Sequence, residues 1–158
     1  MDNSANTVVS ILDTLTEAGF ACCLFGSWAE EVLKLVRPCR HSDIDLLLVA
    51  PSWEMLVRDN PLSVLGFTEI PAKRLPHKRA YVCLDLMVEL ILVQPGGDRL
   101  ETLFWGDITY VWSSPLSCEG MLAGRTIQCA SAENLVRFRA EHYSIQPWRW
   151  EAFPHGSQ

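Results

Sequence analysis

The sequence predicts a mixed α/β (α+β) fold, in which a central β-sheet is flanked by helices and a short helix lies near the C-terminus. Short apolar runs bounded by Gly and Pro are typical of strands, and amphipathic stretches near both ends are typical of helices. A content of 49% hydrophobic and 20% charged residues indicates a globular chain. The 158 residues predict one domain over 1–158, with a core over about 4–112 and a C-terminal hairpin and helix over about 113–158.

The N-terminal part predicts two helices around one strand. Apolar residues recur at helical spacing over about 4–18, and the aromatic, cysteine-rich run 20–25 predicts a buried strand. Gly26 interrupts this run, and Ser27 is a good N-cap for a second helix that we expect to end near Leu35.

The middle of the chain predicts the centre of the sheet. Residues 43–49 are continuously apolar after Asp45, which is typical of a strand that is covered on both faces. A helix is expected over about 51–58, because Pro and Glu occupy its first turn, and a short strand is expected over 67–70. The basic stretch 71–79, PAKRLPHKR, predicts a loop.

The second half predicts two hairpins and a final helix. In 79–94, two β-rich halves flank Leu84-Asp85-Leu86, which we expect to form the turn of the first hairpin. The PGGDR segment that follows is a second turn. The remaining elements are a weaker strand over 108–112, a hairpin that turns at Ala123-Gly124, and a helix that is capped by Ser131 and ends near His142.

Charge and hydropathy limit the classes of partner. A net charge of −6 and a pI near 5.1 argue against nucleic acid, whose binding proteins are more often basic. An acidic surface suits a small cationic substrate. No apolar run approaches the roughly 20 residues of a membrane span, so no membrane partner is expected. The N-terminal stretch MDNSANTVVS lacks the features of a signal peptide, and the expected location is the cytoplasm.

The six cysteines are expected to be reduced. Cys22, Cys23, Cys83 and Cys129 lie in apolar, strand-like stretches, where a free cysteine behaves as a small hydrophobic residue. The chain contains no C-x-x-C pair, which argues against a structural zinc site.

Two carboxylates precede the most apolar run of the chain. Asp43 and Asp45 are two residues apart, so on a strand they point to the same face. Paired carboxylates repel each other unless a cation binds both, and Mg²⁺ accepts such oxygen ligands. A third acid on a neighbouring strand would complete a site for two ions. We favour Glu89, which interrupts an apolar strand pattern, over Asp85 in the expected turn, and Asp85 remains the alternative.

The Gly26-Ser27 step supplies the second half of a candidate site. A strand that ends in Gly-Ser and opens a helix presents free backbone N–H groups and a hydroxyl. Gly26 permits close approach and Ser27 can donate to a phosphate oxygen, so both are candidate nucleotide-binding residues.

Together, these two halves resemble the signature of the DNA polymerase β-type nucleotidyltransferase superfamily, and within it they are similar to the aminoglycoside and lincosamide nucleotidyltransferases. The likeness covers most of the chain from Phe20 to about Tyr143. Ser27 stands where a second Gly is usual, and Glu89 stands where Asp is usual. The matching segments are Gly26-Ser27-Trp28-Ala29, Arg37-Pro38, His41, Asp43-Ile44-Asp45-Leu46, the stretch 85–89 and the stretch 122–131.

The resemblance implies a minimal nucleotidyltransferase fold and transfer of a nucleoside monophosphate from an NTP to a hydroxyl of a small molecule, such as an aminoglycoside-like antibiotic, with release of pyrophosphate. Asp43 and Asp45 would hold one Mg²⁺, and Asp45 and Glu89 would hold a second. Glu89 is also the candidate general base, and it is the family's third metal-binding acid by position. Candidates to neutralise the leaving pyrophosphate are Arg40, Lys78 and Arg79.

Two questions stay open at the level of sequence. The alternative function is a non-catalytic or regulatory member that binds nucleotide or a protein partner, antitoxin-like, which the short C-terminal part favours. A homodimer would complete the acceptor site, and Trp148, Trp150 and Phe153 suit such a contact or pack on their own domain. Among the histidines, His41 is either a hydrogen-bonding loop residue or functional, and surface positions are expected for His77 and His142.

Overall fold

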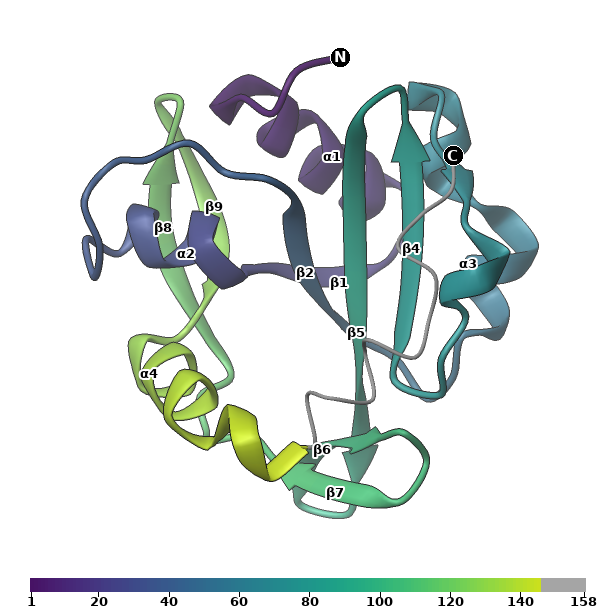
Figure 1. The fold of residues 1–158 in the computed structure, drawn as a ribbon, viewed down its shortest axis with the longest axis vertical. Coiled ribbons are helices and arrows are strands. Elements are labelled where there is room, and N and C mark those ends of the chain that lie inside the picture. Colours follow the sequence, from purple (N-terminus) through teal and green to yellow (C-terminus); the bar gives the residue numbers. More distant parts are fainter. Residues whose placement is uncertain (146–158) are drawn as a thin grey trace.

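A nine-stranded mixed sheet forms the centre of the protein in the computed structural model, which describes residues 1–145 (Figure 1). The strands are β1 (Ala21–Phe25), β2 (Ile44–Val49), β3 (Thr68–Glu69), β4 (Lys78–Cys83), β5 (Leu86–Gly96), β6 (Arg99–Phe104), β7 (Ile108–Val111), β8 (Ser117–Leu122) and β9 (Arg125–Ala130). The helices are α1 (Ala5–Glu17), α2 (Gly26–Val32), α3 (Glu54–Asp59) and α4 (Ala132–Glu141), with 3₁₀ turns η1 (Pro61–Leu65), η2 (Pro71–Lys73) and η3 (His142–Ile145). The predicted mixed α/β class is confirmed.

The order of the strands places β5, β2 and β1 in the middle of the sheet. The main path runs β3-β4-β5-β2-β1-β9-β8, and β6 pairs with β5 and β7. β2 is parallel to β5 and antiparallel to β1, whereas β1 is parallel to β9. The β6–β7 hairpin lies at the bottom of Figure 1, close to the end of α4. Segments that are distant in sequence therefore meet around the central strands.

The central strands are buried because their sequences are apolar on both faces. Leu46, Leu47 and Leu48 follow one another in β2, and each has 0% of its surface exposed. Adjacent residues of a strand point to opposite faces, so both faces of β2 are covered. The structure confirms the prediction of a doubly covered strand over 43–49.

Helix α1 follows the predicted pattern closely. Val8, Ile11 and Leu15 are fully buried, and the hydroxyl of Ser4 accepts a hydrogen bond from the backbone N–H of Thr7. The helix packs against β1 and β9. Within residues 1–145, no helix is long and apolar enough to cross a membrane.

Helix α2 differs from its prediction at both ends. It begins at Gly26, so Ser27 lies in its first turn and is not the N-cap, which is Phe25. It ends at Val32, short of the expected Leu35, because the chain turns into a left-handed conformation at Lys34 (φ 60°). Ser27 therefore has its hydroxyl available for a contact other than a helix cap.

Several boundaries in the second half also differ. The hairpin of β4 and β5 is confirmed, with Leu84-Asp85 at its turn, but β4 begins at Lys78, so the end of the stretch expected as a loop is strand. Strand β6 had no sequence signal, because its buried face carries the polar Thr102 while Leu103 is 41% exposed. Thr102 is satisfied there, since its hydroxyl donates to the Leu92 carbonyl at 2.6 Å. The hairpin of β8 and β9 is confirmed.

Helix α4 is fastened to the loop between β7 and β8. Ser131 caps the helix as predicted, accepting from the Asn134 N–H at 3.3 Å. The fully buried Asn134 side chain accepts from the Ser113 N–H at 2.8 Å and donates to the Ser113 carbonyl at 3.0 Å. Phe138 stacks on Trp112, with ring centroids 5.9 Å apart. Trp148, Trp150 and Phe153, expected at a dimer contact or on their own domain, lie outside the described residues.

Replacing Asn134 should destabilise the protein. In Asn134→Ala, the half-buried N–H and carbonyl of Ser113 lose their partners, and a polar group left unsatisfied by such a change costs about 1–3 kcal/mol where water cannot replace the partner. We expect the free energy of unfolding, measured by urea denaturation, to fall by about 2 kcal/mol. Val136→Ala, at a 60% exposed site of the same helix, should change it by less than about 0.5 kcal/mol. Equal effects of the two substitutions would contradict this account.

Candidate active site

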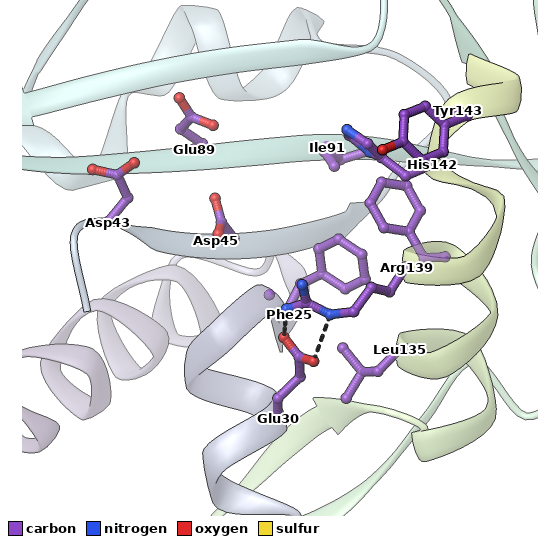
Figure 2. A pocket seen from close by; sticks show the side chains of 12 residues that line it. Phe25, Glu30, Asp43, Asp45, Glu89, Ile91, Leu135, Arg139, His142 and Tyr143 are labelled. Atoms are coloured by element: carbon purple, nitrogen blue, oxygen red, sulfur yellow. Dashed lines mark hydrogen bonds and ion pairs between the residues drawn. The ribbon is translucent and has the colours of Figure 1, made fainter. Parts of the chain in front are cut away.

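A pocket of about 460 Å³ opens beside the ends of β1 and β2 and is closed on one side by α4 (Figure 2). Acidic residues lie at one end of it in Figure 2, and apolar and aromatic residues of α4 and η3 lie at the other. The lining residues are Phe25, Gly26, Glu30, Asp43, Asp45, Glu89, Ile91, Leu135, Phe138, Arg139, His142 and Tyr143.

Three carboxylates meet in this pocket. Asp45 in β2 is the direct register partner of Glu89 in the parallel strand β5, so their side chains lie next to each other on one face of the sheet. Asp43 stands two residues before Asp45 and points the same way, while Ile44 between them is fully buried (Figure 2). The structure thus brings together the three acids that the sequence singled out.

The alternative third acid lies elsewhere. Asp85 is exposed at the turn between β4 and β5 and does not line the pocket. Glu89 is four residues further along β5, in register with Asp45. The geometry therefore favours Glu89 over Asp85 as the third carboxylate.

Burial and mutual repulsion raise the pKa values of the two aspartates. Burial, and after it the neighbouring charges of Glu89 and Asp43, together raise the pKa of Asp45 to about 7, against a smaller lowering by Lys78. Burial and Glu89 also raise the pKa of Asp43. A divalent cation would relieve this repulsion, and three carboxylates supply the hard oxygen ligands that Mg²⁺ prefers. The residues present therefore fit the predicted magnesium site.

Two lysines flank the third acid. Lys78 Nζ lies 2.7 Å from one carboxylate oxygen of Glu89, and Lys73 Nζ lies 3.6 Å from the other. Lys78 was predicted near the site but in a loop; it is instead the first residue of β4, and it is buried. Lys73 was not predicted at the site, although it belongs to the same basic stretch, 71–79. The local sequence does not show which lysines and arginines of that stretch point toward Glu89.

The other predicted cations do not reach the pocket. Arg79 follows Lys78 on β4 and so points to the opposite face. There its guanidinium donates to the Leu75 carbonyl and lies over the Trp53 ring, 4.9 Å from the centroid. Arg40 is exposed in the connection from α2 to β2 and does not line the pocket. Their predicted contacts with pyrophosphate gain no support from this placement.

The Gly26-Ser27 step meets the carboxylates through its glycine. Gly26 has a positive φ of 64°, and a Cβ there would lie 2.4 Å from Oδ2 of Asp45. The missing side chain is therefore what allows the strand end and the acid to approach. Ser27 does not line the pocket; its hydroxyl lies 2.8 Å from Nδ1 of His41.

A small polar network holds the segment that carries Asp43. His41 is buried, stacks on Trp28 with ring centroids 4.1 Å apart, and places Nε2 3.0 Å from a carboxylate oxygen of Glu31. Asn3 donates to the His41 carbonyl at 2.9 Å and accepts from the Trp28 indole at 2.7 Å. Of the two roles left open for His41, the structure provides the hydrogen-bonding one.

The two histidines expected at the surface are placed differently. His77 is buried, with 1% of its surface exposed, and its Nδ1 accepts the Trp105 N–H at 3.0 Å. Burial lowers the pKa of His77 to about 3, so the ring is neutral at physiological pH. His142 is partly buried and lines the pocket. Trp105, which is distant in sequence, contacts the His77 ring, and local pattern cannot reveal such a partner. The His142 ring contacts Phe138, four residues earlier in the chain.

The sequence also gave no sign of an ion pair across the pocket. Glu30 of α2 is 7% exposed, and its carboxylate accepts from the Arg139 guanidinium of α4 at 3.0 Å (Figure 2). The two residues are 109 positions apart. This pair joins the helix beside the carboxylates to the helix that forms the opposite wall.

A family model described as aminoglycoside-2''-adenylyltransferase matches residues 7–146. No curated protein sequence matches the chain significantly. The resemblance stated from the sequence motifs is thus confirmed at the level of the family.

Solved structures share the fold at low identity. ANT(2")-Ia in complex with adenylyl-2"-tobramycin aligns with a TM-score of 0.69 and 18% identity, over 92% of this chain and 79% of that one. The lincomycin-bound lincosamide adenylyltransferase LnuA aligns with a TM-score of 0.70 and 19% identity, over 92% and 96%. A putative nucleotidyltransferase from Thermotoga maritima aligns with a TM-score of 0.63 and 13% identity, over 93% and 89%. At these identities the likeness establishes the fold.

The contact between Gly26 and Asp45 predicts a specific pair of mutational effects. Gly26→Ala adds a Cβ that collides with Asp45, in addition to the strain of a positive φ. Gly124→Ala is a matched control, because Gly124 also has a positive φ (72°) but no atom within 4 Å of the added Cβ. We expect Gly26→Ala to lower the free energy of unfolding by about 2 kcal/mol more than the control. In an Asp45→Ala background, most of this excess should disappear, because the 2.4 Å contact with Oδ2 is removed and only the Cβ of residue 45, at 3.1 Å, remains. If the excess persists in full, the collision with the carboxylate is not its cause.

Burial of Asp45 predicts a pH dependence of stability. Its folded pKa of about 7 is above the ordinary value of 3.8, so folding disfavours the ionised form. The penalty is absent below about pH 4, grows as the pH rises, and is complete above about pH 7. With a chelator present, Asp45→Asn should therefore raise the free energy of unfolding at pH 8 by about 2 kcal/mol and leave it nearly unchanged at pH 4. An equal gain at both pH values would contradict the predicted titration.

Proposed function

Since the chain belongs to the aminoglycoside-2''-adenylyltransferase family, we propose that it transfers a nucleoside monophosphate from an NTP, with ATP as the first candidate, to a hydroxyl of a small cationic acceptor. The reaction releases pyrophosphate. The observation that carries this proposal is the meeting of Asp43, Asp45 and Glu89 at one end of a pocket of about 460 Å³, which has room for a small molecule beside them.

The three carboxylates are the proposed ligands of Mg²⁺. Asp43 and Asp45 would hold one ion, and Asp45 and Glu89 a second. When bound, magnesium neutralises triphosphate charge and lowers the pKa of the acceptor hydroxyl. The pKa of about 7 at Asp45 supports this assignment, because burial and then the charges of Glu89 and Asp43 disfavour a bare carboxylate there, and a bound cation would favour it.

The remaining chemistry falls to the protein's own side chains. Glu89 would accept the proton of the acceptor hydroxyl. The hydroxyl oxygen then bonds to the α-phosphorus of the NTP, and the bond from that phosphorus to pyrophosphate breaks. Lys78 and Lys73, 2.7 and 3.6 Å from Glu89, would offset charge on the leaving group. Gly26, which lets the end of β1 approach Asp45, remains a predicted nucleotide-binding residue. Ser27 remains a predicted phosphate contact.

The acceptor would lie between the carboxylates and α4. Leu135, Phe138 and Tyr143 give this side an apolar and aromatic surface, and the ion pair of Glu30 and Arg139 marks its edge. Aromatic faces and a negative field attract a cationic sugar. Tobramycin, whose 2"-adenylyl form is bound in one structural relative, and lincomycin, bound in another, are therefore the first acceptors to test.

Location and assembly stay as predictions. The six free cysteines and the NTP donor suit the cytoplasm, where thiols remain reduced. A homodimer rests on residues that lie outside the described part of the chain.

The reaction is tested by pyrophosphate release from ATP and Mg²⁺ in the presence of tobramycin or lincomycin. We expect turnover with at least one acceptor, and we expect Asp45→Asn and Glu89→Gln each to reduce kcat/KM at least about 100-fold, because each removes a group used in the transition state. Asp85→Asn is the matched control, since it removes a carboxylate from the same strand pair but outside the pocket.

Three results would redirect the assignment. A large loss in Asp85→Asn would restore Asp85 as the third acid. Calorimetry that detects Mg²⁺-dependent ATP binding without pyrophosphate release from any acceptor would favour the regulatory alternative. Absence of both binding and turnover would contradict the proposed function.

A further inference from the structure

A second cluster of ligand-type side chains lies outside the pocket, where the chain passes from α2 to β2. Glu31, Cys39 and His41 each present one ligand atom, and these atoms lie within 4.8 Å of one another. His41 Nε2 is 3.0 Å from Glu31 Oε1 and 4.0 Å from Cys39 Sγ. None of the three lines the carboxylate pocket.

The spacing of these atoms fits a small metal ion. With metal–ligand distances of about 2.0–2.3 Å, tetrahedral zinc ligands are separated by about 3.3–3.8 Å. The observed separations bracket these values, so side-chain rotation is enough to close the site. Cys39 is exposed and can turn, while His41 is fixed by its stacking on Trp28.

The cluster is already supported by the hydrogen bonds that a metal site needs. The backbone N–H of Cys39 donates to Glu31 Oε1 at 2.9 Å, which orients the carboxylate. The other ring nitrogen of His41, Nδ1, lies 2.8 Å from the Ser27 hydroxyl. Metal-bound histidines keep such a partner on the second nitrogen, where it fixes the tautomer and the orientation of the ring.

We propose that Glu31, Cys39 and His41 form a site for Zn²⁺ or a similar borderline-soft divalent ion, distinct from the Mg²⁺ site of the carboxylates, with water in the fourth position. One thiolate, one imidazole and one carboxylate is a donor set that selects zinc or cobalt over magnesium. Binding releases the thiol proton of Cys39 to solvent, and the single proton of the neutral His41 ring moves from Nε2, where it faces Glu31, to Nδ1. No C-x-x-C pair marks this site in the sequence, because its ligands come from α2 and from the connection between α2 and β2.

Metal binding at this site would change the hydrogen bond between His41 and Ser27. With the ion on Nε2, the His41 ring carries its one proton on Nδ1 and donates it to the Ser27 oxygen. The Ser27 hydroxyl proton then becomes available to another acceptor, such as a phosphate oxygen. The inference itself does not depend on this consequence or on the proposed function.

The test uses the reduced full-length protein and Co²⁺, which replaces zinc in tetrahedral sites and absorbs in the near ultraviolet when a thiolate binds it. We expect the thiolate band to saturate at one Co²⁺ per chain, to be bleached by Zn²⁺ and to be unaffected by excess Mg²⁺. Asp45→Asn should retain the band, which separates this site from the carboxylates.

Variants assign the ligands. Cys39→Ser should abolish the band, and because Cys39 is exposed, its fold should be intact by circular dichroism. Cys118→Ser, at a half-buried cysteine outside the cluster, is the matched control and should retain it. Glu31→Gln should weaken binding of Co²⁺ about 10-fold or more. A wild-type protein with no band, or equal bands in Cys39→Ser and Cys118→Ser, would overturn the proposal.

Discussion

The parallel pairing of β2 with β5 is the constraint on which the candidate site depends. It fixes Asp45 opposite Glu89 and, through the two-residue repeat of a strand, brings Asp43 to the same face. Parallel strands are stable when both faces are covered, and consecutive buried leucines in β2 meet that condition. The tightly packed core thus holds the three carboxylates at its edge in fixed positions.

Keeping acids at the edge of a core opposes stability, and the surroundings offset that cost. Lys78 and Lys73 neutralise Glu89, while Asn3, Trp28 and His41 fix the backbone that leads to Asp43. These contacts come from four different parts of the chain. A site that is preorganised in this way requires little rearrangement when a cation enters.

The sequence revealed what is local and concealed what depends on long-range packing. Asp-x-Asp before an apolar run and a glutamate inside a strand pattern were sufficient to predict which acids meet, because strand geometry has a fixed period. Lys78 and Arg79 could not be told apart, since the start of β4, which decides the face, was hidden in a basic stretch. Strand β6 was missed because a satisfied threonine occupies its buried face. The pair of Glu30 and Arg139 depends on how α4 docks, which no local pattern encodes.

The close approach of Gly26 to Asp45 also constrains how descendants of this protein can diverge. While Asp45 is present, any side chain at position 26 collides with its carboxylate, so only glycine is tolerated there. Once a lineage shortens residue 45, the collision with the carboxylate is removed, and the positive φ is the constraint that still favours glycine at position 26. Substitution of the glycine should therefore follow loss of the acid in evolutionary order. A residue other than glycine at position 26 would then indicate that residue 45 had already lost its carboxylate.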